Sequence, residues 1–141
     1  MSDGEVDFVK VDLLKPSLKN VNVAVKVIGI GKPRSVTSRK DYSVVHRVAE
    51  ALVGDETGCV LLNLWNAQIT AFNKGDVIEI NNGYTSLFRG FLRLNIGRHG
   101  TAEKVDRKIG KVNRDYNLSE KMYDSLLYQP SKIPFRRRRR Q

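Results

Sequence analysis

The sequence of 141 residues is poor in the residue types that build covalent or metal-based sites. Its one cysteine, Cys59, excludes an internal disulfide and any cysteine-cluster metal site. The two histidines, His46 and His99, are far apart in the sequence and have no Asp or Cys at ligand spacing. No phosphate-binding glycine loop, zinc motif or nucleophile elbow is present. We therefore expect no metal, no cofactor, no small-molecule substrate and no enzymatic activity.

Long hydrophobic runs are absent too, and acidic residues are in the minority. No apolar stretch approaches the ~20 residues that a membrane-spanning helix needs. Residues 1–5, which include Asp3 and Glu5, lack the apolar stretch of a signal peptide. These features predict a soluble, cytoplasmic protein without a membrane partner. Lys and Arg number 25 against 15 Asp and Glu, a net charge of +10, which favours a polyanionic partner.

Alternation of apolar and polar residues dominates the first hundred residues and predicts five short strands. We place them at residues 21–28, 44–53, 59–65, 77–84 and 91–96, with a loop at 32–41 and a tight turn at 54–58. A helical turn is expected at 66–73, between the third and fourth strands. This is the strand count and order of an OB fold, so we predict an all-β, five-stranded OB barrel. The apolar residues before the first strand, among them Val11, Leu13 and Leu14, are expected to plug one barrel end.

The character of the sequence changes beyond residue 105. Residues 106–141 hold 11 basic and 4 acidic residues, whereas residues 1–105 hold 14 and 11. We therefore predict an OB-fold nucleic-acid-binding domain over 1–105 and a basic extension over 106–141. In this extension residues 106–116 are expected to form a linker. Asn117 with Glu120 is a helix-start signal that predicts a short helix over 117–128, and a basic tail follows.

Several aromatic residues are hard to explain as core. Trp65 shares the outward face of its predicted strand with Asn63, and Tyr84 and Phe88 bracket the last turn. The alternative is that one of these rings packs beneath a loop. Bases stack on exposed rings with a gain of ~1–3 kcal/mol each. The predicted stacking residues are Trp65, Tyr84, Phe88 and Phe91.

Basic residues are expected on the same surfaces and could neutralise phosphates. Two occupy outward strand positions, four lie in the first long loop, and one lies in the last hairpin. In that order, the predicted phosphate-binding residues are Lys26, Arg93, Lys32, Arg34, Arg39, Lys40 and Arg89. The chain also ends in an arginine run that is either a solvated tail or a phosphate clamp. The predicted tail anchor consists of Arg136, Arg137, Arg138, Arg139 and Arg140.

Three stretches carry a resemblance to a known family. They are Val53-Gly54-Asp55-Glu56-Thr57-Gly58, then Leu62-Asn63-Leu64-Trp65, then Asn82-Gly83-Tyr84-Thr85-Ser86-Leu87-Phe88-Arg89-Gly90. The chain resembles the archaeal single-OB single-stranded DNA-binding proteins over about residues 8–105, and it is similar to the OB-fold subunit of the animal sensor of single-stranded DNA. The resemblance implies that Trp65, Tyr84 and Phe88 are base-stacking positions, with Tyr84 where a tryptophan is common. A short helix and an arginine run replace the glycine-rich C-terminus of those relatives.

These observations predict a sequence-tolerant binder of single-stranded nucleic acid, with DNA favoured by the resemblance. The alternative is an RNA-binding or ribosome-associated structural protein that uses the barrel as a scaffold and the arginine tail as an anchor. A further alternative is an adaptor whose 117–128 helix docks into a larger assembly, such as a repair complex. Stacking and phosphate contacts serve DNA and RNA alike, so composition does not separate the first two.

Overall fold

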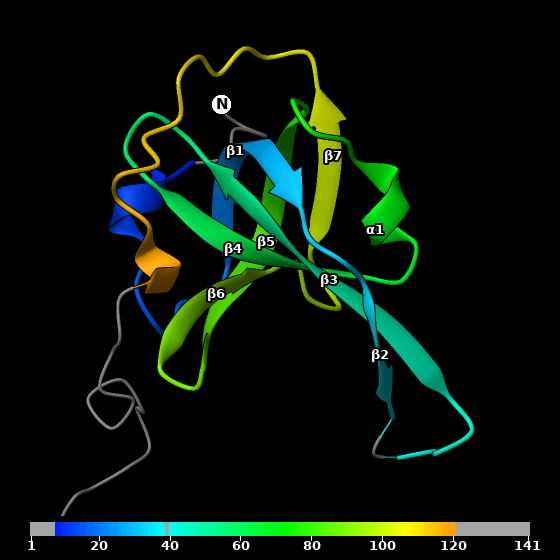
Figure 1. The fold of residues 1–141 in the computed structure, drawn as a ribbon. Coiled ribbons are helices and arrows are strands. Elements are labelled where there is room, and N and C mark those ends of the chain that lie inside the picture. The colour runs from blue at the N-terminus through cyan, green and yellow to red at the C-terminus, as the bar shows by residue number, and fades with distance from the viewer. Residues whose placement is uncertain (1–7, 39, 121–141) are drawn as a thin grey trace, which may run out of the picture.

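The computed structural model describes residues 8–38 and 40–120, and its strands form a small barrel (Figure 1). Along the chain the elements are η1 (Val11–Leu13), β1 (Val21–Ile30), β2 (Arg34–Thr37), β3 (Val45–Gly54), β4 (Cys59–Trp65), α1 (Gln68–Ala71), β5 (Val77–Phe88), β6 (Phe91–Asn95), β7 (Thr101–Val105) and η2 (Leu118–Glu120). All five predicted strands are present, and the predicted helical turn corresponds to α1. No helix among the described residues is long and apolar enough to cross a membrane.

Five of the strands close into a ring. β1 pairs with β3, β3 with β4, β4 with β6, β6 with β5, and β5 returns to β1. All of these pairings are antiparallel except that of β4 with β6, which is parallel and joins Leu61 to Arg93 and Asn63 to Asn95. This closed ring, with α1 between its third and fourth strands, is the predicted OB barrel.

Two further strands lie outside the ring. β2 pairs with the first half of β3, and the two form an arm that extends away from the barrel (Figure 1). The prediction of a continuous loop at 32–41 was therefore wrong for residues 34–37. β7 pairs along the first half of β5. Both strands are short and polar, and both form because a longer neighbouring strand presents a free edge of backbone donors and acceptors.

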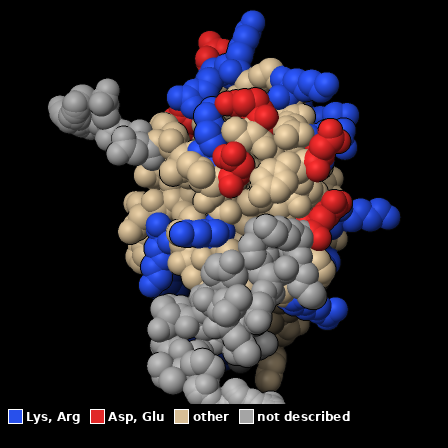
Figure 2. Space-filling view, turned by 90° about the vertical axis from the view of Figure 1, so that its left-hand side faces the viewer, with Lys and Arg blue, Asp and Glu red and all other residues tan. Residues whose placement is uncertain are grey.

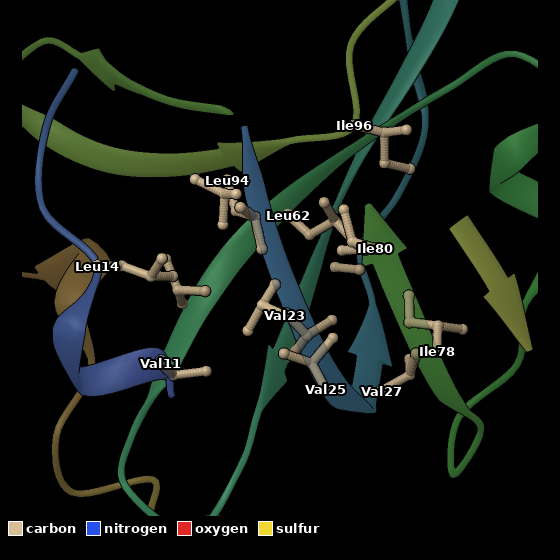
Figure 3. Packing of buried hydrophobic residues seen from close by; sticks show 14 of the residues in the cluster. Val11, Leu14, Val23, Val25, Val27, Leu62, Ile78, Ile80, Leu94 and Ile96 are labelled. Atoms are coloured by element: carbon tan, nitrogen blue, oxygen red, sulfur yellow. The ribbon is translucent and has the colours of Figure 1, made fainter. Parts of the chain in front are cut away.

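The core fills the barrel with aliphatic side chains, as Figure 3 shows. It is built from alternate residues of the ring strands, for example Val23 and Val25 of β1, Leu62 of β4 and Ile80 of β5. Val11 and Leu14 cover one end of the barrel, as predicted. Leu13 does not, because its side chain is 64% exposed.

The turn between β3 and β4 fastens the N-terminal segment to the barrel. The buried carboxylate of Asp55 accepts hydrogen bonds from the backbone N–H groups of Val11 and Thr57 and from the Thr57 hydroxyl. The same hydroxyl oxygen of Thr57 accepts the N–H of Asp12. Asp55 therefore has a structural role in this turn.

The segment after β7 runs back over the barrel, although we predicted a linker for its first part. It has no strand or helix before η2, but Val112, Leu118 and Ser119 are buried. The Ser119 hydroxyl donates to the carbonyl of Leu92 at 2.5 Å and accepts the N–H of Leu61 at 2.8 Å. The described end of the chain thus bridges the beginnings of β4 and β6. We call this contact of Ser119 with Leu61 and Leu92 the seam.

The predicted C-terminal helix can be followed only at its start. The Asn117 side chain accepts the N–H of Ser119, as expected at a helix N-terminus, and η2 begins at Leu118. Residues 121–128 of the predicted helix lie outside the described residues. The boundary predicted at residue 105 stays a prediction: β7 ends at Val105, and Val112 and Leu118 beyond it are buried.

Candidate nucleic-acid interface

Three aromatic side chains emerge on one outer face of β4, β5 and β6, which we call the ring face. Trp65, Tyr84 and Phe88 are 40%, 41% and 46% exposed. Pairing aligns Asn63 of β4 with Asn95 of β6, and Asn95 with Tyr84 of β5. Trp65 lies two residues beyond Asn63 and Phe88 four residues beyond Tyr84, so alternation puts all three rings on the same side of the sheet.

Trp65 is held at the end of β4 by the turn that follows it. Its backbone N–H donates to the Gln68 side chain at 2.9 Å, and Asn66 adopts a positive φ of 53°. The Asn66 side chain accepts the N–H of Arg47 and lies 3.3 Å from Nδ1 of His46. The His46 ring meets the Trp65 ring edge to face, with centroids 6.2 Å apart. These contacts orient the indole while one side remains exposed.

Phe88 is positioned by the tight turn that joins β5 to β6. Arg89 and Gly90 have φ angles of 54° and 90°, as in a two-residue type I′ hairpin, and Phe88 pairs directly with the half-buried Phe91. The guanidinium groups of Arg89 and Arg93 lie 5.2 and 5.4 Å from the centre of the Phe88 ring. Cation–π attraction favours both contacts.

A layer of paired polar groups lies between the rings, and the sequence analysis did not identify it. The amide of Asn63 donates to Oδ1 of Asn95, and the amide of Asn95 donates to the Ser86 hydroxyl, both at 2.9 Å. Nε of Arg93 donates to the Glu50 carboxylate at 2.8 Å. These groups bind one another across the floor of the ring face.

Arg93 is therefore not the exposed cation that strand alternation suggested. It does lie on the outer side of β6, as predicted, but it is only 8% exposed because Glu50 and Phe88 cover it. Its guanidinium also donates to the carbonyl of Leu92. Alternation predicts the side of a strand on which a residue lies, but not the side chains that cover it.

The other predicted cations are distributed unevenly. Arg89 is exposed beside Phe88, and Lys32, Arg34 and Lys40 are exposed in and around the arm. Arg34 pairs with Val48, which pairs with Trp65, so Arg34 is in line with the indole across the sheet.

Lys26 lies elsewhere, because its ammonium group approaches the carbonyl of Gly110 at 3.5 Å, in the segment that runs back over the barrel. Arg39 and the tail residues Arg136, Arg137, Arg138, Arg139 and Arg140 lie outside the described residues.

Charge of both signs is mixed on the upper part of the face turned toward the viewer in Figure 2, on the side of the barrel where η1 lies. Lys10, next to η1, and Glu56 form an exposed ion pair at 2.7 Å. Their hydrogen bond raises the pKa of Lys10 and lowers the pKa of Glu56. A surface of this kind offers no uniform positive potential to a polyanion. Within residues 8–38 and 40–120, no group of three or more His, Cys, Asp or Glu side chains could hold a metal ion.

Comparison with known proteins relates this barrel to a family of nucleic-acid-binding proteins. Residues 14–104 match the family described as single-stranded DNA binding protein Ssb-like, OB fold. The single-stranded DNA binding protein Ssb of Saccharolobus solfataricus is 39% identical over 88 residues, which are 62% of this chain and 57% of that protein. An uncharacterized protein of Arabidopsis thaliana is 33% identical over 124 residues, 83% of this chain and 81% of that one.

Solved structures agree on the fold. A hypothetical protein from Arabidopsis thaliana superposes with a TM-score of 0.71 at 32% identity and covers 94% of this chain and 98% of its own. A replication factor A related protein from Methanobacterium thermoautotrophicum superposes with a TM-score of 0.58 at 25% identity and covers 71% and 92%.

Proposed function

Because this chain belongs to the Ssb-like OB-fold family of single-stranded DNA binding proteins, we propose that it binds single-stranded DNA on the ring face. Bases stack on Trp65, Tyr84 and Phe88 while the phosphates run along the surrounding cations. The observation that carries the proposal is the exposure of three rings on one face of the barrel. A strand crossing this face meets one ring on β4 and two on β5.

The charges around the rings support this path. Glu50, the carboxylate in the floor, is paired with Arg93, so its charge is largely neutralised where the strand would pass. Arg89 lies beside Phe88, and Arg34 is in line with Trp65. We therefore assign phosphate contacts to Arg89, Arg34, Lys32 and Lys40, and we assign Arg93 to the support of Phe88.

The floor of the ring face also bears on sequence preference. Reading a base needs hydrogen-bonding groups that are free to face its edge. Here the side chains of Asn63, Asn95 and Ser86 are engaged with one another. Stacking accepts any base, because every base has a π-face. Binding is therefore sequence-tolerant.

The test is binding of the full chain to single-stranded DNA, duplex DNA and RNA across a salt series. Trp65 is the single tryptophan, so its fluorescence reports on the site directly. We expect oligo-dT to quench it, and Trp65→Ala, followed by fluorescence anisotropy of labelled DNA, to lose ~1–3 kcal/mol of binding. Leu13→Ala, a substitution of an exposed side chain on η1, is the control. Undiminished affinity in Trp65→Ala would reject the stacking mechanism.

The remaining parts of the proposal concern the chain as a whole. Residues 1–105 form the binding domain and 106–141 a basic extension whose arginine run adds sequence-independent phosphate contacts. We assign no catalytic step, and we place the protein in the cytoplasm or wherever unpaired DNA is exposed. Deleting residues 130–141 tests the extension: weaker binding with a shallower salt dependence is expected. A loss confined to RNA would instead favour the RNA-associated role.

A further inference from the structure

A pocket opens beside Tyr84, at the edge of the ring face. Its volume is about 510 Å³, within the range of small-ligand sites. Three segments line it: residues 17–20 before β1, residues 82–85 of β5, and residues 98–99 between β6 and β7. Tyr84 belongs both to this pocket and to the ring face, so the two surfaces are continuous. We call it the Tyr84 pocket.

Hydrogen bonds fix two of the three walls to each other. The buried Thr85 exchanges bonds with the segment before β1: its hydroxyl donates to the carbonyl of Lys15 at 2.6 Å and accepts the N–H of Leu18 at 2.8 Å, and its N–H donates to the carbonyl of Leu18. The Asn22 side chain accepts the N–H of Asn82. Two of the three walls are therefore joined by bonds of the protein itself.

The backbone is unusual around the pocket. Ser17, Asn20 and Asn82 all have φ angles between 55° and 66°, which non-glycine residues seldom adopt. The pairing of β1 with β5 also shifts register between Val21 and Val23, next to this wall. Such features cost free energy and cluster at binding sites.

The charges of the lining favour an anion. Lys19 and Arg98 are exposed at the pocket, His99 is next to Arg98, and no lining residue is acidic. Neither Lys19 nor Arg98 forms an ion pair with another described residue. Leu18 and the Tyr84 ring provide an apolar wall. A flat apolar group with an attached phosphate matches this combination.

We propose that the Tyr84 pocket takes one unpaired nucleotide, the neighbour of the nucleotide stacked on Tyr84, with its phosphate between Lys19 and Arg98. The inference rests on the proposed function and extends the strand's path past the ring face. It adds a binding site whose cations, Lys19 and Arg98, were not among the predicted contacts. The site gives the path a defined end at this side of the barrel.

The first test is a length series of oligo-dT, from about 4 to 16 nucleotides, followed by the fluorescence of Trp65. The double variant Lys19→Ala/Arg98→Ala should bind the shortest oligomers as the unaltered protein does and lose about tenfold with those long enough to reach the pocket. Its salt dependence should be shallower by about 0.7 for each lost phosphate contact.

The matched control is Lys108→Ala/Lys111→Ala, which removes the same charge from exposed positions beyond β7. It should bind every oligomer as the unaltered protein does. Equal losses in both double variants would show a general charge effect and overturn the proposal. Unchanged affinity of Lys19→Ala/Arg98→Ala at every length would overturn it as well.

A second test uses the shortest oligo-dT that reaches the pocket, so that the strand has a single register on the protein, and places one abasic residue at either end. The unaltered protein should lose affinity about tenfold for one end only, because a strand enters the pocket with one polarity. Equal affinity for both abasic strands and the complete strand would reject a base in the pocket. If no length of oligo-dT quenches the fluorescence of Trp65 in the unaltered protein, the proposed function itself is rejected.

Discussion

The ring of Tyr84 lies directly against Gly97. A Cβ atom at residue 97 would stand 2.9 Å from Cε1 and 3.0 Å from Cδ1 of the tyrosine. Gly97 also has a φ of 83°, which disfavours any side chain. The glycine after β6 thus lets the chain turn and also leaves room for an exposed ring on β5.

Gly97→Ala should therefore affect both folding and binding. The left-handed backbone predicts a loss of about 1–2 kcal/mol in the free energy of unfolding. Displacement of Tyr84 predicts a loss of about 1–3 kcal/mol in DNA affinity. Urea unfolding and oligo-dT titration measure the two effects.

Gly75→Ala separates the effect of backbone strain from the effect of displacing Tyr84. Gly75 has a φ of 95°, but a Cβ atom there would meet no other atom within 4 Å. It should lose stability and keep its affinity. Equal affinity losses in the two variants would show that strain, and not the position of Tyr84, accounts for the effect.

The ion pair of Glu50 and Arg93 predicts opposite effects on binding for its two partners. Arg93→Met leaves a half-buried carboxylate without its partner on the ring face, so stability should fall by about 1–3 kcal/mol and binding should weaken. Glu50→Gln removes negative charge from the path of the strand and should strengthen binding by about twofold to fivefold. Binding titrations at low and high salt, with the double variant to complete the cycle, measure the coupling. Weaker binding in both single variants would contradict a neutralising role for Arg93.

The turn before β5 predicts an acid-sensitive part of the stability. The pKa of Asp76 is lowered, first by the backbone N–H of Asn73 and then by Lys104, whose ammonium group is 3.3 Å away. A lowered pKa stabilises the fold above the ordinary value of 3.8, and this stabilisation disappears as the pH falls through the folded-state pKa.

Asp76→Asn should therefore be less stable than the unaltered protein at pH 7, and the difference should vanish in strong acid. Urea midpoints across the pH range measure it. The exposed Asp106→Asn, just after β7, is the control. A difference that stays undiminished in strong acid, below the lowered pKa of Asp76, would show that the carboxylate charge is not its cause.

The seam closed by Ser119 predicts where the chain can be shortened. Ser119→Ala leaves the N–H of Leu61 and the carbonyl of Leu92 without this partner and should cost about 1–3 kcal/mol. Truncation after Val105 should destabilise the barrel more, because it also removes the buried Leu118 and Val112. Truncation after Glu120 keeps these contacts and should leave the urea midpoint near that of the full chain. Equal midpoints for the two truncations would mean that residues 106–120 are dispensable.

Local patterns were sufficient to predict the barrel. The alternation of Val60, Leu62 and Leu64 with Leu61, Asn63 and Trp65 predicted β4 with its observed bounds, because a half-buried strand buries every second residue. The same rule identified Trp65 as outward-facing. Arg34–Thr37 was predicted as loop because a short polar strand depends on the free edge of a distant strand and leaves no local pattern.

Contacts between distant segments account for the rest. Lys26 and Arg93 both lie on outward strand positions, yet Lys26 meets the segment around Gly110 and Arg93 is covered by Glu50 and Phe88. Strand periodicity contains no information about a segment that returns 84 residues later. The polar floor escaped prediction for the same reason, since Asn63 and Asn95 meet only through the parallel pairing of β4 with β6.

The seam also determines where a label or a solid support can be attached relative to Trp65. Cys59 binds the backbone of Tyr116 at the start of β4, whereas Trp65 ends the same strand, about 20 Å away at ~3.3 Å per residue. A dye, a bead or a fused protein attached beyond Glu120 is thus joined near one end of β4, while the indole stands at the other. Immobilised in this way, the molecule would keep Trp65 accessible from solution, whereas Phe88, which pairs with Phe91 at the start of β6, would lie near the attachment.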